Sequence, residues 1–138
     1  MTDANSDPIA SVTGPGAPIT TYSSDEIVTL PPTATIREAA RLMDTASVGC
    51  VVIGAVDAVD GVVTERDIVR VLATGLDPDR ATVADIESRT LQWAGTDATV
   101  GDVAEEMMEG YVRHVLVGEA GRLQGIVSMR DVVTAYLS

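Results

Sequence analysis

Apolar residues follow two different spacings along this chain. Helical spacing, with apolar residues three and four positions apart, begins at Ile36 and returns at Val100. Each helical stretch is followed by two short apolar runs, the kind of segment that forms buried strands: Cys50–Val56, Val59–Val63, His114–Val117 and Leu123–Val127. A further helical stretch closes each half, at Asp67–Ala73 and Asp131–Leu137. The pattern predicts helix, strand, strand and helix, twice.

Polar residues mark where these elements begin and turn. Ile27–Leu30 and Thr90–Trp93 are expected to form a short leading strand before each first helix. Thr35 with Glu38 predicts a capping box at a helix start, and Thr99 with Asp102 is a weaker counterpart.

The strand pairs are expected to be joined by hairpin turns of unequal quality. Glu119-Ala120-Gly121-Arg122 is a favourable hairpin turn, whereas its counterpart around Asp57-Ala58 lacks glycine and is expected to be irregular. Thr82 is expected to open a short additional helix.

The second half of the chain repeats the first at a constant offset, without a gap. Ala34-Thr35 aligns with Ala98-Thr99, and Arg66-Asp67 aligns with Arg130-Asp131. Further identities fall in the same register, at 40 and 104, 43 and 107, 51 and 115, 61 and 125, and 63 and 127. The chain is therefore predicted to be a duplicated α+β unit. We expect a flexible tail over 1–17, a first motif over 18–76, a linker over 77–81 and a second motif over 82–138.

Composition and charge limit the possible functions. The net charge is −12, and all nine basic residues are Arg. Such an acidic surface repels phosphate backbones and anionic head groups, so nucleic acid and membranes are not expected partners. Salt adaptation and codon bias in a GC-rich genome both remain open as reasons for this composition. The N-terminal residues do not form a signal peptide pattern and no apolar stretch could cross a bilayer, so a cytoplasmic protein is expected.

Catalytic and metal-binding constellations are absent from the sequence. Cys50 is the only cysteine, lies in an apolar run and is expected to be a buried, inert thiol. With His114 as the only histidine, there is neither a nucleophile–base pair nor metal-ligand spacing, and no Walker-type loop is present. We therefore expect neither an enzyme nor a bound metal or cofactor.

One motif occurs at the same phase of both repeats: Gly61-Val62-Val63-Thr64-Glu65-Arg66-Asp67 and Gly125-Ile126-Val127-Ser128-Met129-Arg130-Asp131. In each copy a strand ends and a helix begins at the hydroxyl residue, where free N–H groups and the helix dipole favour an anion. The carboxylate three residues later can accept hydrogen bonds from ribose hydroxyls. Ser/Thr-x-x-Asp is also an ordinary capping pair, so the motif alone leaves capping open, whereas its duplication favours a ligand role.

The repeat, its element order and the Gly-Val-Val-Thr-Glu-Arg-Asp motif resemble the CBS (cystathionine β-synthase-type) motif family, from about residue 18 to residue 138. This resemblance implies two motifs packed as one Bateman module with pseudo-two-fold symmetry. It also implies binding of AMP, ADP, ATP, S-adenosylmethionine or a related ligand in clefts between the motifs, and a homodimer.

The resemblance also implies which residues line each cleft. The first would use Thr35, Ala40, Val48 and Gly49 with Ile126, Ser128 and Asp131. The second would use Thr99, Ala104, Val112, Arg113 and His114 with Val62, Thr64 and Asp67. In both, the backbone at 48–49 or 112–113 would read adenine, the Asp would hold ribose, and the Thr or Ser would meet phosphate.

The two repeats differ at one informative place. Arg113-His114 resembles the family's frequent Arg-His, whereas the first repeat has Gly49-Cys50. A guanidinium is a strong phosphate partner, so the cleft with Arg113 and Asp67 is the favoured site. For His114, phosphate contact and a structural position remain open. Arg66 and Arg130 are expected to pair with surface acids rather than phosphate, and Trp93 is expected in the core.

The sequence thus predicts a regulatory module that binds an adenosine nucleotide and acts on a regulated protein that it does not identify. The alternative is a dimerisation module with vestigial clefts, because the chain contains no effector domain to regulate.

Overall fold

The structure, a computed structural model, describes residues 13–138, which form two compact units. Unit 1 contains residues 13–26, 92–120 and 124–138, and unit 2 contains residues 27–91 and 121–123. The sequence repeats and the spatial units therefore do not coincide. Each unit is described separately below.

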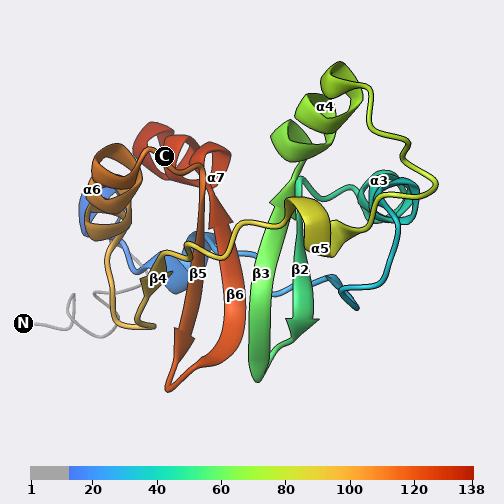
Figure 1. Cartoon of the computed structure of the whole chain (residues 1–138). Coiled ribbons are helices and arrows are strands. Elements are labelled where there is room, and N and C mark those ends of the chain that lie inside the picture. Colours follow the sequence, from blue (N-terminus) through green and yellow to red (C-terminus); the bar gives the residue numbers. More distant parts are fainter. Residues whose placement is uncertain (1–12) are drawn as a thin grey trace, which may run out of the picture. The chain divides into compact units, whose positions relative to one another are not determined.

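Unit 2 holds most of the first repeat (Figure 1). Its sheet has the order β1-β2-β3, formed by Thr29–Leu30, Cys50–Ala55 and Ala58–Thr64. β1 runs parallel to β2, and β2 runs antiparallel to β3. Its helices are α3 (Ile36–Ala46), α4 (Glu65–Thr74) and the short α5 (Val83–Ile86).

Unit 1 repeats this plan with the second half of the chain (Figure 1). Its sheet has the order β4-β5-β6, formed by Trp93–Ala94, His114–Glu119 and Arg122–Ser128, with β4 parallel to β5. Its longer helices are α6 (Val100–Gly110) and α7 (Met129–Leu137). The 3₁₀ helix η2 (Gly14–Gly16) and α2 (Ile19–Tyr22) complete the unit.

The register of the sequence repeat carries through to the backbone geometry. The bounds of α3, β2 and β3 map onto those of α6, β5 and β6 in this register. Even the helix ends agree, because α3 and α6 are both followed by a non-glycine residue in the left-handed region, Ser47 (φ 56°) and Tyr111 (φ 54°). The duplicated α+β fold predicted from the sequence is confirmed. Packing of the two motifs into one Bateman module remains a proposal.

The leading segment of each repeat lies against the body of the other repeat. In unit 1, isolated β-bridges join Pro18 to Thr99 and Ser24 to Ile126. In unit 2, Thr82 and Ser88, the equivalents of Pro18 and Ser24 in the repeat, are bridged to Thr35 and Val62. Each unit is therefore completed by a segment that precedes the opposite repeat. The division of the chain into one motif over residues 18–76 and another over residues 82–138 remains a prediction.

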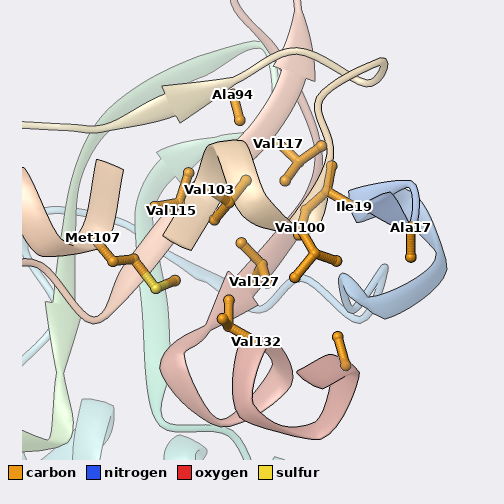
Figure 2. Close-up of a cluster of buried hydrophobic side chains, with 11 residues drawn as sticks. Ala17, Ile19, Ala94, Val100, Val103, Met107, Val115, Val117, Val127 and Val132 are labelled. Atoms are coloured by element: carbon orange, nitrogen blue, oxygen red, sulfur yellow. The ribbon is translucent and has the colours of Figure 1, made fainter. Parts of the chain in front are cut away.

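Each unit has its own aliphatic core. In unit 1, Val100, Val103 and Met107 from α6 face Val115, Val117 and Val127 from the strands, with Val132 of α7 and Ile19 closing the cluster (Figure 2). In unit 2, Ile36 and Met43 of α3 pack with Val51, Ile53 and Val63, and Val83 occupies the place that Ile19 has in unit 1. Burial of these branched side chains supplies most of the driving force for folding.

Most of the local predictions are confirmed. Thr35 with Glu38 and Thr99 with Asp102 both form complete capping boxes. The second capping box, expected to be the weaker one, therefore has the same two hydrogen bonds as the first. Ala120 and Gly121 both have positive φ, as a two-residue hairpin turn requires. The first hairpin is irregular, as expected, because its register shifts between Ile53 and Gly54.

The expectation of a flexible tail over residues 1–17 is wrong for the last residues of that segment. Residues 1–12 lie outside the described residues, but Gly14–Gly16 form η2 and the side chain of Ala17 is fully buried in the core of unit 1. Ala17 also accepts a backbone hydrogen bond from Val100 at 2.9 Å. Abundant Pro and Gly favour a flexible segment, but here the same residues build the turn that brings Ala17 to α6.

Candidate functional site

The motif residues gather where a strand leads directly into a helix. In unit 2, β3 ends at Thr64 beside the start of β2, since Cys50 and Thr64 are register partners. The first amide of α4, from Glu65, donates to the carbonyl of Gly49 at 3.0 Å. In unit 1, the amide of Met129 at the start of α7 donates to the carbonyl of Arg113 at 2.8 Å. Each junction thus ties the loop before the second strand to a helix N-terminus.

The hydroxyl and the carboxylate of each motif are bonded to one another. In unit 2, the amide and the hydroxyl of Thr64 donate to Oδ2 of Asp67 at 2.8 and 3.1 Å. In unit 1, the amide and hydroxyl of Ser128 donate to Oδ2 of Asp131 at 2.7 and 2.9 Å. These bonds use Oδ2 of each Asp, and a carboxylate has lone pairs on both oxygens with which it can accept a hydrogen bond from a ligand hydroxyl.

Because a hydroxyl has a single proton, these bonds decide which hydroxyls can donate to a phosphate. Thr64 and Ser128 direct their protons to the Asp, so either must give up that bond before donating to a ligand. Thr35 and Thr99 use their hydroxyls only as acceptors, from the amides of Glu38 and Asp102 at 3.1 and 3.2 Å. Their protons are uncommitted among the described residues, which the sequence pattern did not reveal.

The backbone predicted to read adenine presents both a donor and an acceptor. The amides of Val48 and Val112 are bonded to the carbonyls of Met43 and Met107, at 3.1 and 3.2 Å. The next amides, of Gly49 and Arg113, form no bond with the described residues. An adenine edge presents an acceptor nitrogen beside an amino donor, which such a free N–H and a neighbouring carbonyl can match.

The other predicted residues surround these junctions. Ala40 in unit 2 and Ala104 in unit 1 are half-buried against the two cores. Val62 exchanges backbone hydrogen bonds with Ser88 at 2.9 and 3.0 Å, and Ile126 does the same with Ser24 at 2.8 and 2.9 Å. The backbones of Val62 and Ile126 are therefore engaged, and only their side chains could contact a base.

The basic residues differ in exposure and pairing. Arg113 is exposed and forms no ion pair with the described residues, so its guanidinium is available to an anion. His114 is half-buried. Arg66 and Arg130 are exposed, and the expected pairing with surface acids is not found for either among residues 13–138. Trp93 is half-buried in β4 and is not among the residues of the core of unit 1, so the expected core position is wrong.

The thiol of Cys50 lies at the same junction but has low reactivity. Burial, with a smaller contribution from the negative charge of Asp67, raises its pKa to about 12. A thiol that is protonated at neutral pH is a poor nucleophile and a poor metal ligand. Among the described residues, no three His, Cys, Asp or Glu side chains gather in the manner of a metal site.

The predicted residues thus fall into one group in each unit. Unit 2 contains one group: Thr35, Ala40, Val48, Gly49, Val62, Thr64 and Asp67. Unit 1 contains the other: Thr99, Ala104, Val112, Arg113, His114, Ile126, Ser128 and Asp131. Each predicted cleft draws on both groups, so the joining of the groups into clefts remains a proposal.

Comparison with known proteins agrees with this geometry. The CBS domain family profile matches residues 19–74 and 83–138, two segments that begin and end at equivalent positions of the repeat. The chain belongs to the CBS domain family. No helix among residues 13–138 is long and apolar enough to cross a membrane.

Similar proteins are found in Methanopyrus kandleri, Pyrococcus horikoshii and Pyrobaculum aerophilum. The uncharacterized protein MK0525 of Methanopyrus kandleri is 33% identical over 78% of this CBS-domain chain, which spans 57% of that protein. A crystal structure of an uncharacterized conserved protein from Pyrococcus horikoshii has a TM-score of 0.80 and 32% identity, covering 88% of this chain and 92% of that one. The CBS domain protein PAE2072 from Pyrobaculum aerophilum, solved in complex with AMP, has a TM-score of 0.74 and 32% identity, covering 87% and 98%.

Proposed function

We propose that this chain is a regulatory module that binds an adenosine nucleotide in clefts built from both CBS motifs, and that it does not catalyse a reaction. The observation that carries the proposal is the strand-to-helix junction of each unit. There, the carboxylate of Asp67 or Asp131 lies near a helix N-terminus and a free backbone amide. Ribose hydroxyls, phosphate and an adenine edge are the groups that these features can bind.

The favoured cleft combines Arg113 with Thr64 and Asp67. Arg113 is exposed and unpaired among the described residues, and a guanidinium can bind phosphate through two parallel hydrogen bonds. Thr99 supplies a hydroxyl with an uncommitted proton on the same unit as Arg113. The AMP complex of the relative from Pyrobaculum aerophilum supports a nucleoside monophosphate as the ligand class.

The experiment is thermal unfolding of the purified protein with AMP, ADP, ATP, S-adenosylmethionine or NAD, at low and high salt. A ligand that binds only the folded state, at about 100 times its dissociation constant, stabilises it by about 2.7 kcal/mol. The proposal requires that at least one adenosine compound raises the midpoint and that Asp67→Ala removes the increase. If no compound raises the midpoint at millimolar concentration in either salt condition, nucleotide binding is excluded.

A second candidate function, dimerisation, is favoured by exposed apolar side chains that recur in the register of the repeat. Val69 and Leu72 on α4 are 64% and 56% exposed, and Val133 and Tyr136 on α7 are 49% and 48% exposed. An apolar helix face of this kind can be covered by the same face of a second copy, as in a symmetric dimer. Sedimentation of the wild type and of a Val69→Glu, Val133→Glu variant tests this. A wild type that is still monomeric at about 100 μM would exclude dimerisation.

A further inference from the structure

The helix α6 of unit 1 differs in charge from the other long helices. It contains four carboxylates and no basic residue, and so has a net charge of −4: Asp102, Glu105, Glu106 and Glu109. α3, α4 and α7 each contain as many basic as acidic residues and are neutral. One helix of 11 residues therefore carries a third of the net charge of −12.

This charge is unfavourable within α6 itself. Asp102 and Glu106, like Glu105 and Glu109, are four positions apart, where like charges repel one another. Burial, followed by the negative charges of Asp102 and Glu109, raises the pKa of Glu106 above its ordinary value of 4.5. The last turn of α6, at the negative end of the helix dipole, contains no basic residue. Among residues 13–138, Glu105, Glu106 and Glu109 form no ion pair with an arginine, so the fold does not compensate their charge.

Two large apolar side chains are exposed beside these carboxylates. Met108 is 72% exposed and Tyr111 is 94% exposed, whereas Val103 and Met107 on the opposite side of α6 pack into the core (Figure 2). Met108 has Glu105 three positions before it and Tyr111 three positions after it, the spacing of neighbouring side chains on a helix. Tyr111 ends α6 in the left-handed region, which a residue with a large side chain adopts at a cost. Packing within unit 1 therefore accounts for neither exposed side chain.

The equivalent helix of the first repeat shows that the fold does not require these residues. α3 packs against its own core through the same positions as α6. We name the surface formed by Glu105, Met108, Glu109 and Tyr111 the α6 face. In the register of the repeat, these residues correspond to Arg41, Asp44, Thr45 and Ser47 of unit 2. The α6 face is thus a feature of the second repeat that has no counterpart in the first.

We infer that the α6 face is a docking surface for a segment of a partner protein that carries Arg or Lys beside apolar side chains. Apolar groups of such a segment would cover Met108 and Tyr111, and its cations would pair with Glu105 and Glu109. The inference goes beyond nucleotide binding and does not depend on it, because none of these four residues belongs to the proposed clefts.

Charge argues against the other occupants of the α6 face. The same face of a second copy would place its carboxylates against those of the first. Residues 1–12 contain Asp3 and Asp7 and no Arg, so this segment of the chain does not complement the face either. Nucleic acid and anionic membranes are repelled by it. A basic and partly apolar protein segment is the occupant that complements both the charge and the apolar side chains.

Fluorescence anisotropy with three labelled peptides tests the inference on the full chain, at about 0.15 M salt. The first peptide consists of Leu and Arg at the spacing of an amphipathic helix. The second has Ser in place of Leu, and the third has Glu in place of Arg. We expect only the Leu–Arg peptide to bind the wild type saturably, with one peptide per chain.

A variant that copies the surface of α3 onto α6 identifies where the peptide binds. It combines Glu105→Arg, Met108→Asp, Glu109→Thr and Tyr111→Ser, all at exposed residues, and should weaken binding of the Leu–Arg peptide by at least about tenfold. Thermal unfolding verifies that this variant is folded. Met108→Ser, a single change at an exposed residue that leaves the charge unaltered, should weaken binding about threefold or more and serves if the fourfold variant does not fold.

The double variant Asp44→Asn, Asp57→Asn is the matched control. It raises the net charge by two units, as the fourfold variant does, but at exposed residues of unit 2. It should bind the Leu–Arg peptide like the wild type. The inference is overturned if the fourfold variant binds no more weakly than this control, or if the Arg–Ser peptide binds the wild type as tightly as the Leu–Arg peptide. It is also overturned if sedimentation shows a wild-type dimer that the fourfold variant loses, because a second copy would then cover the α6 face.

Discussion

The carboxylate of Asp67 accepts the same two hydrogen bonds from Thr64 that the carboxylate of Asp85 accepts from Thr82 in the same unit. In each pair one carboxylate oxygen accepts from both the amide and the hydroxyl of the threonine, at 2.8 and 3.1 Å for Asp67 and at 3.0 and 3.2 Å for Asp85. Only the first pair belongs to the duplicated Gly-apolar-apolar-Thr/Ser-x-x-Asp motif. Substituting the Asp of each pair can therefore distinguish a capping role from a ligand-binding role.

Asp67→Ala and Asp85→Ala should each lower the free energy of unfolding by about 1 kcal/mol, because each removes an equivalent capping interaction. Only Asp67→Ala should abolish stabilisation by AMP. Chemical denaturation with and without AMP measures both quantities. If Asp85→Ala weakened AMP binding as much as Asp67→Ala, the motif carboxylate would have no role beyond capping.

Gly61→Ala should be more destabilising than Gly125→Ala, although the two glycines are equivalent in the repeat. A Cβ at Gly61 would lie 2.7 Å from the carbonyl oxygen of Ser88 and would also collide with the carboxylate of Glu87. A Cβ at Gly125 would approach the Ser24 carbonyl and the Ser23 hydroxyl only to 3.1 Å. We expect a loss of about 2–3 kcal/mol for Gly61→Ala and about 1 kcal/mol or less for Gly125→Ala, measured by urea denaturation. Equal losses would contradict the close approach of residues 87–88 to β3.

The buried carboxyl of Glu87 should make stability fall as the pH rises. Burial, followed by the negative charge of Asp60, raises the pKa of Glu87 above its ordinary value of 4.5, against the smaller opposing effect of Arg89. An acid with a raised pKa in the folded state loses its proton more readily when unfolded. Its contribution is therefore largest below pH 4.5 and is lost as the pH rises through the folded-state pKa.

Glu87→Gln removes this titration and should raise the unfolding midpoint at pH 7 by about 3 °C. Relative to the wild type, the gain should shrink toward zero as the pH is lowered below 4.5. Thermal unfolding from pH 4 to pH 8 measures both changes. A gain that stays constant across this range would show that folding does not raise the pKa of Glu87.

Cys50 should not react with thiol reagents while the protein is folded. Its side chain is buried and its pKa is raised to about 12, so very little thiolate exists at pH 8. We expect modification by a disulfide reagent to be at least about 100-fold slower than for the protein unfolded in urea. Rapid labelling of the folded protein would mean that the start of β2 opens readily.

Periodicity and the internal repeat were sufficient to predict the elements, because the pattern of buried positions fixes which face of each helix and strand points inward. Thr35, Thr64, Thr99 and Ser128 were all expected to begin helices, and all do. The exchange of leading segments could not be predicted, although Ile19 aligns with Val83 and Ser24 with Ser88 in the same register. A repeat shows that two segments have equivalent environments, but it does not show which body each one contacts.

The sequence predicted which residues belong to the candidate site, but it did not predict the hydrogen bonds that these residues form. The hydroxyl and the Asp of each motif were identified, but hydrogen-bond direction decides that Thr35 and Thr99 have the uncommitted protons. The carboxylate of Glu65 over Gly49 is likewise a matter of side-chain position. Such contacts depend on the tertiary structure around a residue and are not encoded in its spacing.

The exchanged leading segments also set an order for folding during synthesis on the ribosome. Apart from residues 121–123, unit 2 is contained in residues 27–91, so most of its core can form while the second repeat is still being translated. Unit 1 cannot follow, because Ala17 and Ile19 must wait for Val100, Val115 and Val132 of the second repeat. Until then these two side chains remain exposed to solvent, where chaperones act on such segments. The core of unit 1 is therefore complete only after α7 has been synthesised, because Val132 and Ala135 of that helix belong to it.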